Sequence, residues 1–389
     1  MIPYSRQTVT QDDIDEVVRV LRSDFLTQGP AVPKFEKSVR DYCSVDFAVA
    51  TCNATAALHC ACLALGVSAG DEVWVSAISF VASANCARYC GAKVHFVDVN
   101  PGTGNISAET LEYDLKQAAK EARIPKVLIV VHLAGQSCDM QAISLLCRQY
   151  DVAIVEDACH ALGGRYQGLA IGGCQFSDIT IFSFHPVKPI TSGEGGMLVT
   201  NNEKLAERAR LFACHGIAKE PHLWQDAIEA EGQPGWYYEQ QVLGFNYRLS
   251  DIHAALGTSQ LTRLDKQVRY RRVLAEYYDR LFASGRLCMP LDRHQECASA
   301  FHLYIVRFKS ASVRNRIYDA LRQAGYGVNL HYRPIPEQPY YQRISTEKRL
   351  LPGAKQYAET ALSLPLFQGM ERQQLDQVVQ IIEQAMAGL

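Results

Sequence analysis

The sequence has no apolar run long enough to cross a bilayer, and its first residues contain no apolar stretch of signal-peptide length. Neither sign of charge predominates, because the formal net charge is −2. A membrane span is therefore excluded and a nucleic-acid surface is not indicated. We expect a cytoplasmic protein without nucleic-acid or membrane partners, in which any anionic ligand needs a local pocket of hydrogen-bond donors.

The chain also lacks any C-x-x-C pair, although it has 13 cysteines. Zinc sites commonly use such pairs, and disulfide scaffolds are short and dense in cysteine. Many of the cysteines lie inside apolar helix or strand patterns, among them Cys60, Cys62, Cys86, Cys90 and Cys147. We therefore predict reduced, mostly buried thiols that pack as small apolar side chains, and no metal site.

Short apolar strands alternate with helices over the first half of the 389 residues. This alternation predicts a mostly parallel sheet covered by helices, the α/β class, and the length favours one large domain plus a smaller one. The expected strands span 48–51, 72–75, 94–97, 126–131, 153–156 and 179–184, and the helices between them span 55–65, 81–89, 108–122 and 140–150.

The alternation stops at an irregular, aromatic-rich segment near 218–240. A long helical pattern follows over about 250–281, and it is the expected hinge between two domains. Beyond it, a strand over 301–308 and helices near 313–324 and 371–387 indicate a smaller α+β domain. We therefore predict a large ligand-binding domain over 1–249 and a smaller domain over 250–389 that includes the long helix.

Lys188 has an unusual setting for a lysine on a loop. It follows a buried strand, lies between Pro186 and Pro189, and is followed by a glycine-rich stretch over 193–196. The prolines fix the backbone around the amine, and the glycines permit close approach to a ligand. A lysine that forms an imine must shed its proton, so it needs such a controlled position. The alternative is a surface lysine on a tight turn.

Other polar or aromatic residues follow predicted strands at comparable points. Asp157 ends one strand, the segment 53–55 follows another and opens a helix, and Phe80 lies between a strand and a helix. Ligands of open α/β sheets bind beyond the carboxyl ends of the strands. We therefore expect these positions and Lys188 to meet at one edge of the sheet.

These residues together suit pyridoxal 5′-phosphate (PLP). Thr55 and the N–H groups of a helix start would bind a phosphate, with the Ser183 hydroxyl beside them. Asp157 would pair with a protonated ring nitrogen, Phe80 would stack on a flat ring, and Lys188 would carry an imine.

Each residue taken alone also has an ordinary structural interpretation. Thr55 would be a helix cap, Asp157 a turn residue and Phe80 part of the core. His160 and His185 would be structural histidines.

The chain resembles the DegT/StrS family of PLP-dependent sugar aminotransferases over nearly its whole length. That resemblance implies the fold-type-I architecture, with a large sheet domain and a smaller C-terminal α+β domain. The motifs that carry it span residues 26–29, 53–58, 79–85, 156–163, 183–196 and 244–252.

The resemblance implies a role for each matching residue around the cofactor. Lys188 would form the imine with PLP, Asp157 would hold the ring N–H, His160 would lie near the ring hydroxyl, and Phe80 would stack on the ring. Ala54, Thr55 and Ser183 would bind the phosphate, and Asn246 would reach the phosphate of the neighbouring subunit's cofactor, which implies a homodimer with shared active sites.

On the substrate side, Tyr4, His331 and Tyr332 match positions near the nucleotide-sugar. Many relatives have a histidine where this chain has Glu337 or its neighbour, so the match is less complete there.

The implied reaction moves an amino group from L-glutamate to a nucleotide-sugar ketone and releases 2-oxoglutarate. The lysine segment is similar to the subgroup that aminates C4 of a UDP-4-keto-6-deoxy-N-acetylhexosamine in pseudaminic acid synthesis. Another 4-keto or 3-keto nucleotide-sugar and a non-catalytic protein on the same fold are the alternatives. A dehydrating relative has a histidine in place of the lysine, so Lys188 argues against that chemistry.

Overall fold

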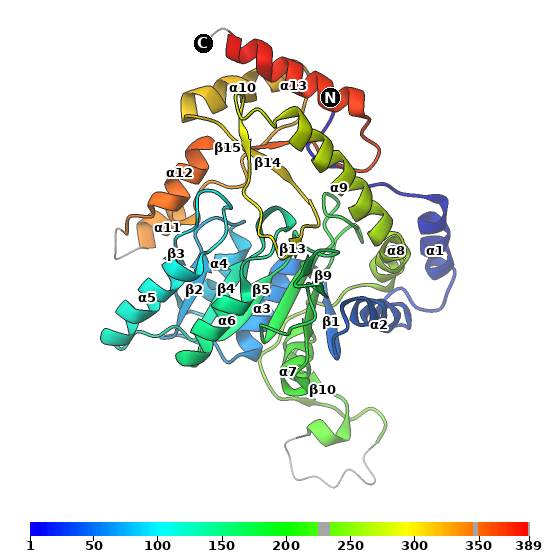
Figure 1. Ribbon diagram of the computed structural model, residues 1–389. Helices are drawn as coiled ribbons and strands as arrows, with labels where there is room; N and C mark the ends of the chain where they lie inside the picture. Colours follow the sequence, from blue (N-terminus) through cyan, green and yellow to red (C-terminus); the bar gives the residue numbers. More distant parts are fainter. Residues whose placement is uncertain (225–233, 345–348, 388–389) are drawn as a thin grey trace.

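The computed structural model describes residues 1–224, 234–344 and 349–387 and is built around a seven-stranded sheet in the order β1-β9-β8-β5-β4-β2-β3 (Figure 1). Only β9 is antiparallel to its neighbours, and the remaining strands of this sheet run in one direction. The predicted mostly parallel sheet is therefore confirmed. Its strands are β1 (Phe47–Thr51), β2 (Glu72–Ser76), β3 (Lys93–Val97), β4 (Val127–Val131), β5 (Ala153–Asp157), β8 (Ile179–Ser183) and β9 (Gly196–Thr200).

Helices cover both faces of this sheet because its central strands are apolar on both sides. In β4, Val127 and Ile129 join one core cluster, whereas Leu128 and Val130 join another. Alternate residues of a strand face opposite sides, so each face receives its own apolar layer. The first layer packs with α3 (Ala54–Ala64), α4 (Ala82–Tyr89) and α7 (Glu203–Ala213), and the second with α5 (Ala108–Lys120) and α6 (Met140–Gln149) (Figure 1).

The N-terminal helices α1 (Gln11–Leu21) and α2 (Ala31–Cys43) pack against α8 (Asp251–Leu261). Two buried carboxylates hold this contact. Asp13 accepts hydrogen bonds from Ser259 and Arg263, at 2.6 Å each, and Asp251 accepts bonds from the first backbone N–H groups of α2. Acidic side chains are stabilised at a helix start, so Asp251 fixes where α2 begins.

The helix predicted over 250–281 is wrong as a single element. It consists of α8 and α9 (Leu264–Leu281), separated at Thr262 and Arg263. The backbone N–H groups of these two residues bond to carbonyls three residues back, and the Thr262 hydroxyl bonds to the Ser259 carbonyl at 2.7 Å. The break leaves the apolar period nearly unchanged, so the sequence pattern does not reveal it. The predicted domain boundary at 249/250 and the hinge stay predictions.

The C-terminal part has its own core around a three-stranded antiparallel sheet in the order β12-β14-β15. Its strands are β12 (Met289–Pro290), β14 (Tyr304–Arg307) and β15 (Ala361–Leu364), and α9, α10 (Ala311–Gln323) and α13 (Arg372–Ala387) contribute to that core. The strand predicted over 301–308 starts later, because Phe301 has φ 48° and the Arg271 guanidinium bonds to the carbonyls of Phe301 and His302.

Shorter elements complete the described residues. They are β6 (Arg165–Tyr166), β7 (Leu169–Ala170), β10 (Ile217–Ala218), β11 (Glu239–Gln240), β13 (Cys297–Ala298), α11 (Pro339–Ile344), α12 (Pro352–Thr360) and 3-10 turns at Leu133–Gly135, Pro221–Leu223 and Ile335–Glu337. Of the predicted irregular segment 218–240, residues 225–233 lie outside the described residues, and β10 and β11 pair on either side of them. All 13 cysteines are free thiols, and most are buried, as predicted. None of the helices in the described ranges has the length and apolar character needed to cross a membrane.

Candidate active site

Strand register brings the predicted positions to one edge of the large sheet. Asp157, the last residue of β5, pairs with Ile181 of β8. Two residues further along β8, Ser183 pairs with Gly196, and Gly196 also pairs with Thr51 at the end of β1. The carboxyl ends of β8 and β5 therefore lie side by side, and the carboxyl end of β1 lies at the same edge, separated from β8 by the start of β9. The expected convergence of the segments that follow them is confirmed.

The loop that carries Lys188 is tied down at both ends. The Phe184 N–H donates to the Gly195 carbonyl at 2.9 Å, which closes the loop. The Ser5 hydroxyl donates to the Val187 carbonyl at 2.8 Å, next to the lysine. A segment from the chain's N-terminus therefore holds the backbone at Lys188, and no sequence motif pointed to Ser5.

The Lys188 amine lies in a setting that disfavours its charge. Burial lowers the pKa of Lys188 below its ordinary value, against the opposing effects of the nearby Cys159 thiol and the Asp157 carboxylate. Desolvation penalises an ammonium, so the neutral amine is more available here than on an open surface. Lys188 is also only partly exposed, so it is not a fully solvated lysine on an open turn.

Asp157 is buried, with 5% of its surface exposed. One carboxylate oxygen accepts a hydrogen bond from the Ser83 hydroxyl at 2.6 Å, and the other accepts one from the Cys159 N–H at 3.2 Å. Its backbone carbonyl accepts from the His132 N–H at 3.1 Å. Asp157 is thus a strand residue fixed by its neighbours and not a free turn residue.

Three buried histidines, His160, His302 and His331, lie close enough to Lys188 for its charge to affect their pKa values. Burial lowers the pKa of His160 and of His302 well below the ordinary value, and it lowers that of His331 to about 3. The positive charge of Lys188 acts in the same direction on each of them. All three rings are therefore neutral at pH 7 and act as hydrogen-bonding groups.

The proton position on His160 follows from its contacts. The Ala134 N–H donates to His160 Nδ1 at 3.3 Å, so the neutral ring carries its proton on Nε2. That nitrogen lies 3.2 Å from the Tyr332 hydroxyl, and the two rings stack with centroids 6.1 Å apart. His302 packs against the same imidazole at 4.4 Å.

The predicted substrate residues form one group around His331. Its Nδ1 lies 2.8 Å from the Ser363 hydroxyl, and its carbonyl accepts a bond from the Tyr357 hydroxyl at 2.6 Å. The Tyr4 ring lies 5.0 Å from the His331 ring, and the Tyr332 ring lies 4.9 Å from it. Tyr4 therefore lies beside His331 and Tyr332, although it is more than 300 residues away from them in the sequence.

The start of α3 offers free backbone donors. Asn53 is the N-cap, and its side chain accepts from the Ala56 N–H at 2.9 Å, so the cap role considered for Thr55 is wrong. A helix leaves its first N–H groups without helical partners, which makes those of Ala54 and Thr55 available to an anion. A Cβ on Gly196 would lie 2.4 Å from the Asn53 carbonyl carbon, so only glycine lets β9 start here.

Phe80 and Asn246 are both exposed. Phe80 has 58% of its surface exposed, so its placement in the core is wrong, and its ring lies 6.2 Å from that of Tyr332. Asn246 precedes Tyr247, whose carbonyl accepts from the Cys52 N–H at 2.7 Å beside the start of α3. The predicted reach of Asn246 into a partner subunit stays a prediction. His185 is exposed and distinct from the buried histidine group.

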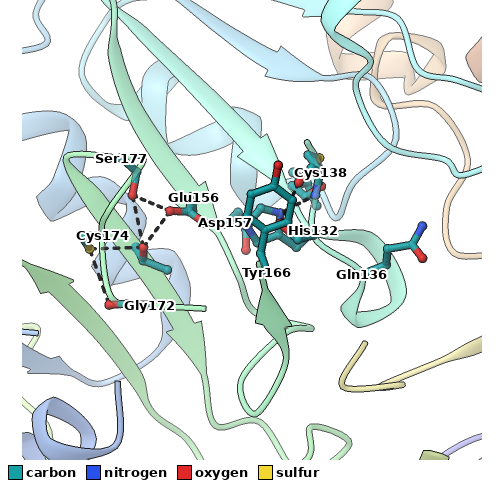
Figure 2. A network of polar contacts seen from close by, with 12 residues as sticks. His132, Gln136, Cys138, Glu156, Asp157, Tyr166, Gly172, Cys174 and Ser177 are labelled. Atoms are coloured by element: carbon teal, nitrogen blue, oxygen red, sulfur yellow. Dashed lines mark hydrogen bonds and ion pairs between the residues drawn. The ribbon is translucent and has the colours of Figure 1, made fainter. Parts of the chain in front are cut away.

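A second buried carboxylate, Glu156, lies on the other side of β5 and was not singled out from the sequence. It accepts bonds from His132 Nε2 at 2.6 Å and from the hydroxyls of Ser177 and Thr180 at 2.5 and 3.3 Å (Figure 2). Burial raises the pKa of Glu156, but these hydrogen bonds outweigh it and the net pKa is lowered. The Cys138 N–H donates to His132 Nδ1, so this ring also carries its proton on Nε2.

Comparison with known proteins places this geometry among aminotransferases. The model of the DegT/DnrJ/EryC1/StrS aminotransferase family matches residues 7–383. A UDP-4-amino-4,6-dideoxy-N-acetyl-beta-L-altrosamine transaminase from Campylobacter jejuni is 37% identical over 373 residues, which cover 95% of this chain and 93% of that protein.

Solved structures agree along the whole chain. PseC of Helicobacter pylori, an aminotransferase involved in the biosynthesis of pseudoaminic acid, superimposes with a TM-score of 0.89 at 29% identity and covers all of both chains. The sugar aminotransferase Spr1654 of Streptococcus pneumoniae covers 99% of both chains, with TM-scores of 0.89 in its PMP form and 0.87 in its PLP form at 30% and 29% identity. The expected fold class is confirmed.

Proposed function

Because the chain belongs to the DegT/DnrJ/EryC1/StrS aminotransferase family, we propose that it moves the amino group of L-glutamate to the C4 ketone of a UDP-4-keto-6-deoxy-N-acetylhexosamine. The products are UDP-4-amino-4,6-dideoxy-N-acetyl-β-L-altrosamine and 2-oxoglutarate. The observation that carries the aminotransferase chemistry is the desolvated Lys188 amine beside the fixed Asp157 carboxylate. The named substrate rests on the similarity to the Campylobacter jejuni transaminase.

The residues at the sheet edge fit PLP. Free N–H groups at Ala54 and Thr55 and the Ser183 hydroxyl suit a phosphate, and Gly196 leaves no side chain in the narrow space beside Asn53. The exposed Phe80 ring suits a flat aromatic ligand. When bound, PLP supplies an electron-withdrawing ring that stabilises negative charge at the reacting carbon.

Lys188 is the proposed proton carrier. Its lowered pKa keeps a fraction of the amine neutral and able to take a proton from the amino acid's α-carbon, and the same group returns a proton afterwards. Asp157, acting as a carboxylate, would hold the ring nitrogen in its protonated form. The neutral His160 is fixed by Ala134 and Tyr332 and would offer its Nε2 proton to the ring hydroxyl side.

The substrate side is assigned to Tyr4, His331 and Tyr332, which lie together next to Lys188. Their rings offer flat and hydrogen-bonding surfaces to a nucleotide-sugar, and binding far from C4 helps to position the ketone. We further propose a homodimer in which Asn246 completes the partner's phosphate site. A cytoplasmic location belongs to the same proposal.

The activity test uses purified, PLP-loaded protein and glutamate with a panel of UDP- and dTDP-linked 4-keto and 3-keto sugars. Mass spectrometry of the nucleotide-sugars identifies any aminated product. We expect amination of the UDP-4-keto-6-deoxy-N-acetylhexosamine above the other panel members. Amination of a different sugar alone would overturn the named substrate, and the absence of any aminated sugar would overturn the function.

A further inference from the structure

Ser83 makes the shortest hydrogen bond to the Asp157 carboxylate. It lies in the first turn of α4, its side chain is fully buried, and its hydroxyl oxygen is 2.6 Å from an Asp157 carboxylate oxygen. The same hydroxyl lies 2.6 Å from the hydroxyl of Ser79. Two serines and a carboxylate therefore form a continuous chain behind the proposed cofactor site.

The direction of this chain follows from counting protons. An ionised carboxylate only accepts, so the single hydroxyl proton of Ser83 points to Asp157. Ser83 has no second proton for Ser79, so Ser79 donates to Ser83. The hydrogen bond from Ser79 to Ser83 polarises the Ser83 hydroxyl, which strengthens the hydrogen bond that Ser83 donates to Asp157.

We propose that Ser83 is a positioning residue that fixes the direction of the Asp157 carboxylate, so that its remaining lone pairs can hold a protonated ring nitrogen. This inference rests on the proposed function. A carboxylate oxygen that accepts a short hydrogen bond is held in one direction, and its other lone pair stays available to a ligand. The Cys159 N–H anchors the other oxygen, so without Ser83 the carboxylate loses one of its two fixed contacts.

Ser83 acts on one carboxylate oxygen, and among the residues that the structure describes its hydroxyl bonds to Ser79 and Asp157 and not to Lys188 or the histidine group. Loss of the Ser83 hydroxyl should therefore change the protonation of the cofactor's ring nitrogen more than it changes the binding of either substrate. Hydrogen bonds to charged groups are strong enough to predict a decrease in kcat of roughly tenfold, with KM for glutamate and for the keto sugar nearly unchanged.

The test compares Ser83→Ala with Ser144→Ala in protein loaded with PLP that carries ¹⁵N at the ring nitrogen. Ser144 is a matched control because it is also buried but bonds only to the backbone carbonyl of Gln141, on α6. We expect the ¹⁵N signal to show a protonated nitrogen in the wild type and in Ser144→Ala. In Ser83→Ala it should shift toward the unprotonated position.

A PLP analogue with carbon in place of the ring nitrogen gives a second, independent readout. With this analogue the wild type and Ser83→Ala should have equal rates, because the group that Asp157 would hold is missing. An unchanged ¹⁵N signal, or an undiminished rate difference with the analogue, would overturn the role of Ser83. If Ser83→Ala does not fold, Ser83→Cys keeps the volume with a weaker donor and is expected to shift the signal the same way.

Failure of the proposed function is recognised separately. If the wild-type protein bound no PLP, this result would contradict both the proposed function and the role of Ser83. A wild-type protein with a protonated ring nitrogen, alongside an unchanged Ser83→Ala, removes only the role of Ser83.

Discussion

The two faces of β5 at its carboxyl end carry two consecutive buried carboxylates with different surroundings. Glu156 is enclosed by the imidazole of His132 and the hydroxyls of Ser177 and Thr180 (Figure 2). Asp157, on the opposite face, is held by Ser83 and one backbone N–H, next to the Lys188 amine. Alternation along a strand separates two chemically similar residues into two environments.

The two carboxylates differ in how much hydrogen-bond acceptor capacity the fold leaves free. Every neighbour of Glu156 that donates to it comes from the sheet or a loop packed on it, so its charge is satisfied internally. Asp157 is fixed in direction but keeps acceptor capacity, since each carboxylate oxygen has more than one lone-pair position. We therefore propose that Glu156 stabilises the fold and that Asp157 binds the ligand.

The largest effect is expected for Lys188→Ala. Removing the amine removes the proposed proton carrier, and turnover should fall by more than about a thousandfold. Stopped assays with mass detection of the aminated sugar measure this loss, and the visible absorbance of the bound cofactor should change as well. Circular dichroism should show an unchanged fold, and turnover within tenfold of the wild type would remove Lys188 from the mechanism.

Asp157→Asn should have the next largest effect on turnover. The amide keeps the size of the side chain but carries no charge to hold a protonated ring nitrogen. We expect kcat to fall by about a hundredfold or more, with a change in the free energy of unfolding below about 1 kcal/mol. Steady-state kinetics and urea unfolding measure the two quantities, and an active Asp157→Asn enzyme would contradict the assignment.

Glu156→Gln should show the reverse pattern. Loss of a buried, hydrogen-bonded charge should lower the free energy of unfolding by about 2 kcal/mol. At temperatures where the variant is folded, kcat should stay within about fivefold of the wild type, because the proton transfer does not use Glu156. If Glu156→Gln kept the wild-type free energy of unfolding but lost its turnover, Glu156 would be the catalytic carboxylate and the roles given to Glu156 and Asp157 would be reversed.

The pH dependence of stability sharpens the same comparison. The folded-state pKa of Glu156 lies below its ordinary value of 4.5, so its stabilising contribution is present above pH 4.5 and is lost as the pH falls through the folded-state value. The free energy of unfolding, measured with urea, should therefore decrease more for the wild type than for Glu156→Gln as the pH is lowered from 6 into the acid range. If the free energy of unfolding of the two proteins changed with pH in parallel, Glu156 would not contribute to the pH dependence of stability.

Phe80→Leu should have the smallest effect. The ring is exposed, so its replacement should leave the free energy of unfolding unchanged, while a lost aromatic stacking contact should raise the Kd for PLP by about fivefold. Equilibrium titration of the apo-protein with PLP measures this Kd. Tyr113→Leu offers a matched exposed aromatic on α5 and should leave the Kd unchanged.

The meeting of these strand ends at one edge, where the site is proposed, was predictable from the sequence. Thr55 and the Lys188 loop each follow an apolar strand and Asp157 ends one, and parallel strands bring such ends to one edge. Phe80 also follows a strand of this sheet, β2, and its exposure contradicts the core interpretation, while its contact with a cofactor stays a prediction. The glycine-rich stretch after Lys188 contains the start of β9. This strand was not expected, because it begins directly after the loop and runs antiparallel to its neighbours.

Other features depend on tertiary contacts that leave no local pattern. In the sequence, Ser83 has the pattern of an ordinary serine at a helix start. Its hydrogen bond to Asp157 joins residues that are 74 positions apart in the sequence. Arg271 sits in a helical pattern where a charged residue suggests an exposed face, yet it is buried and bonds to backbone carbonyls. The break between α8 and α9 follows from local hydrogen bonds that the apolar period does not record.

The comparison of the two carboxylates is tested most directly by one labelling experiment. Wild type, Glu156→Gln and Asp157→Asn, each loaded with PLP, are given ¹⁵N-glutamate and the UDP-4-keto sugar, and the mass of the aminated sugar is followed over time. We predict rapid incorporation of ¹⁵N by the wild type and by Glu156→Gln, and incorporation slowed by about a hundredfold or more in Asp157→Asn. Equal incorporation by all three proteins would contradict the account.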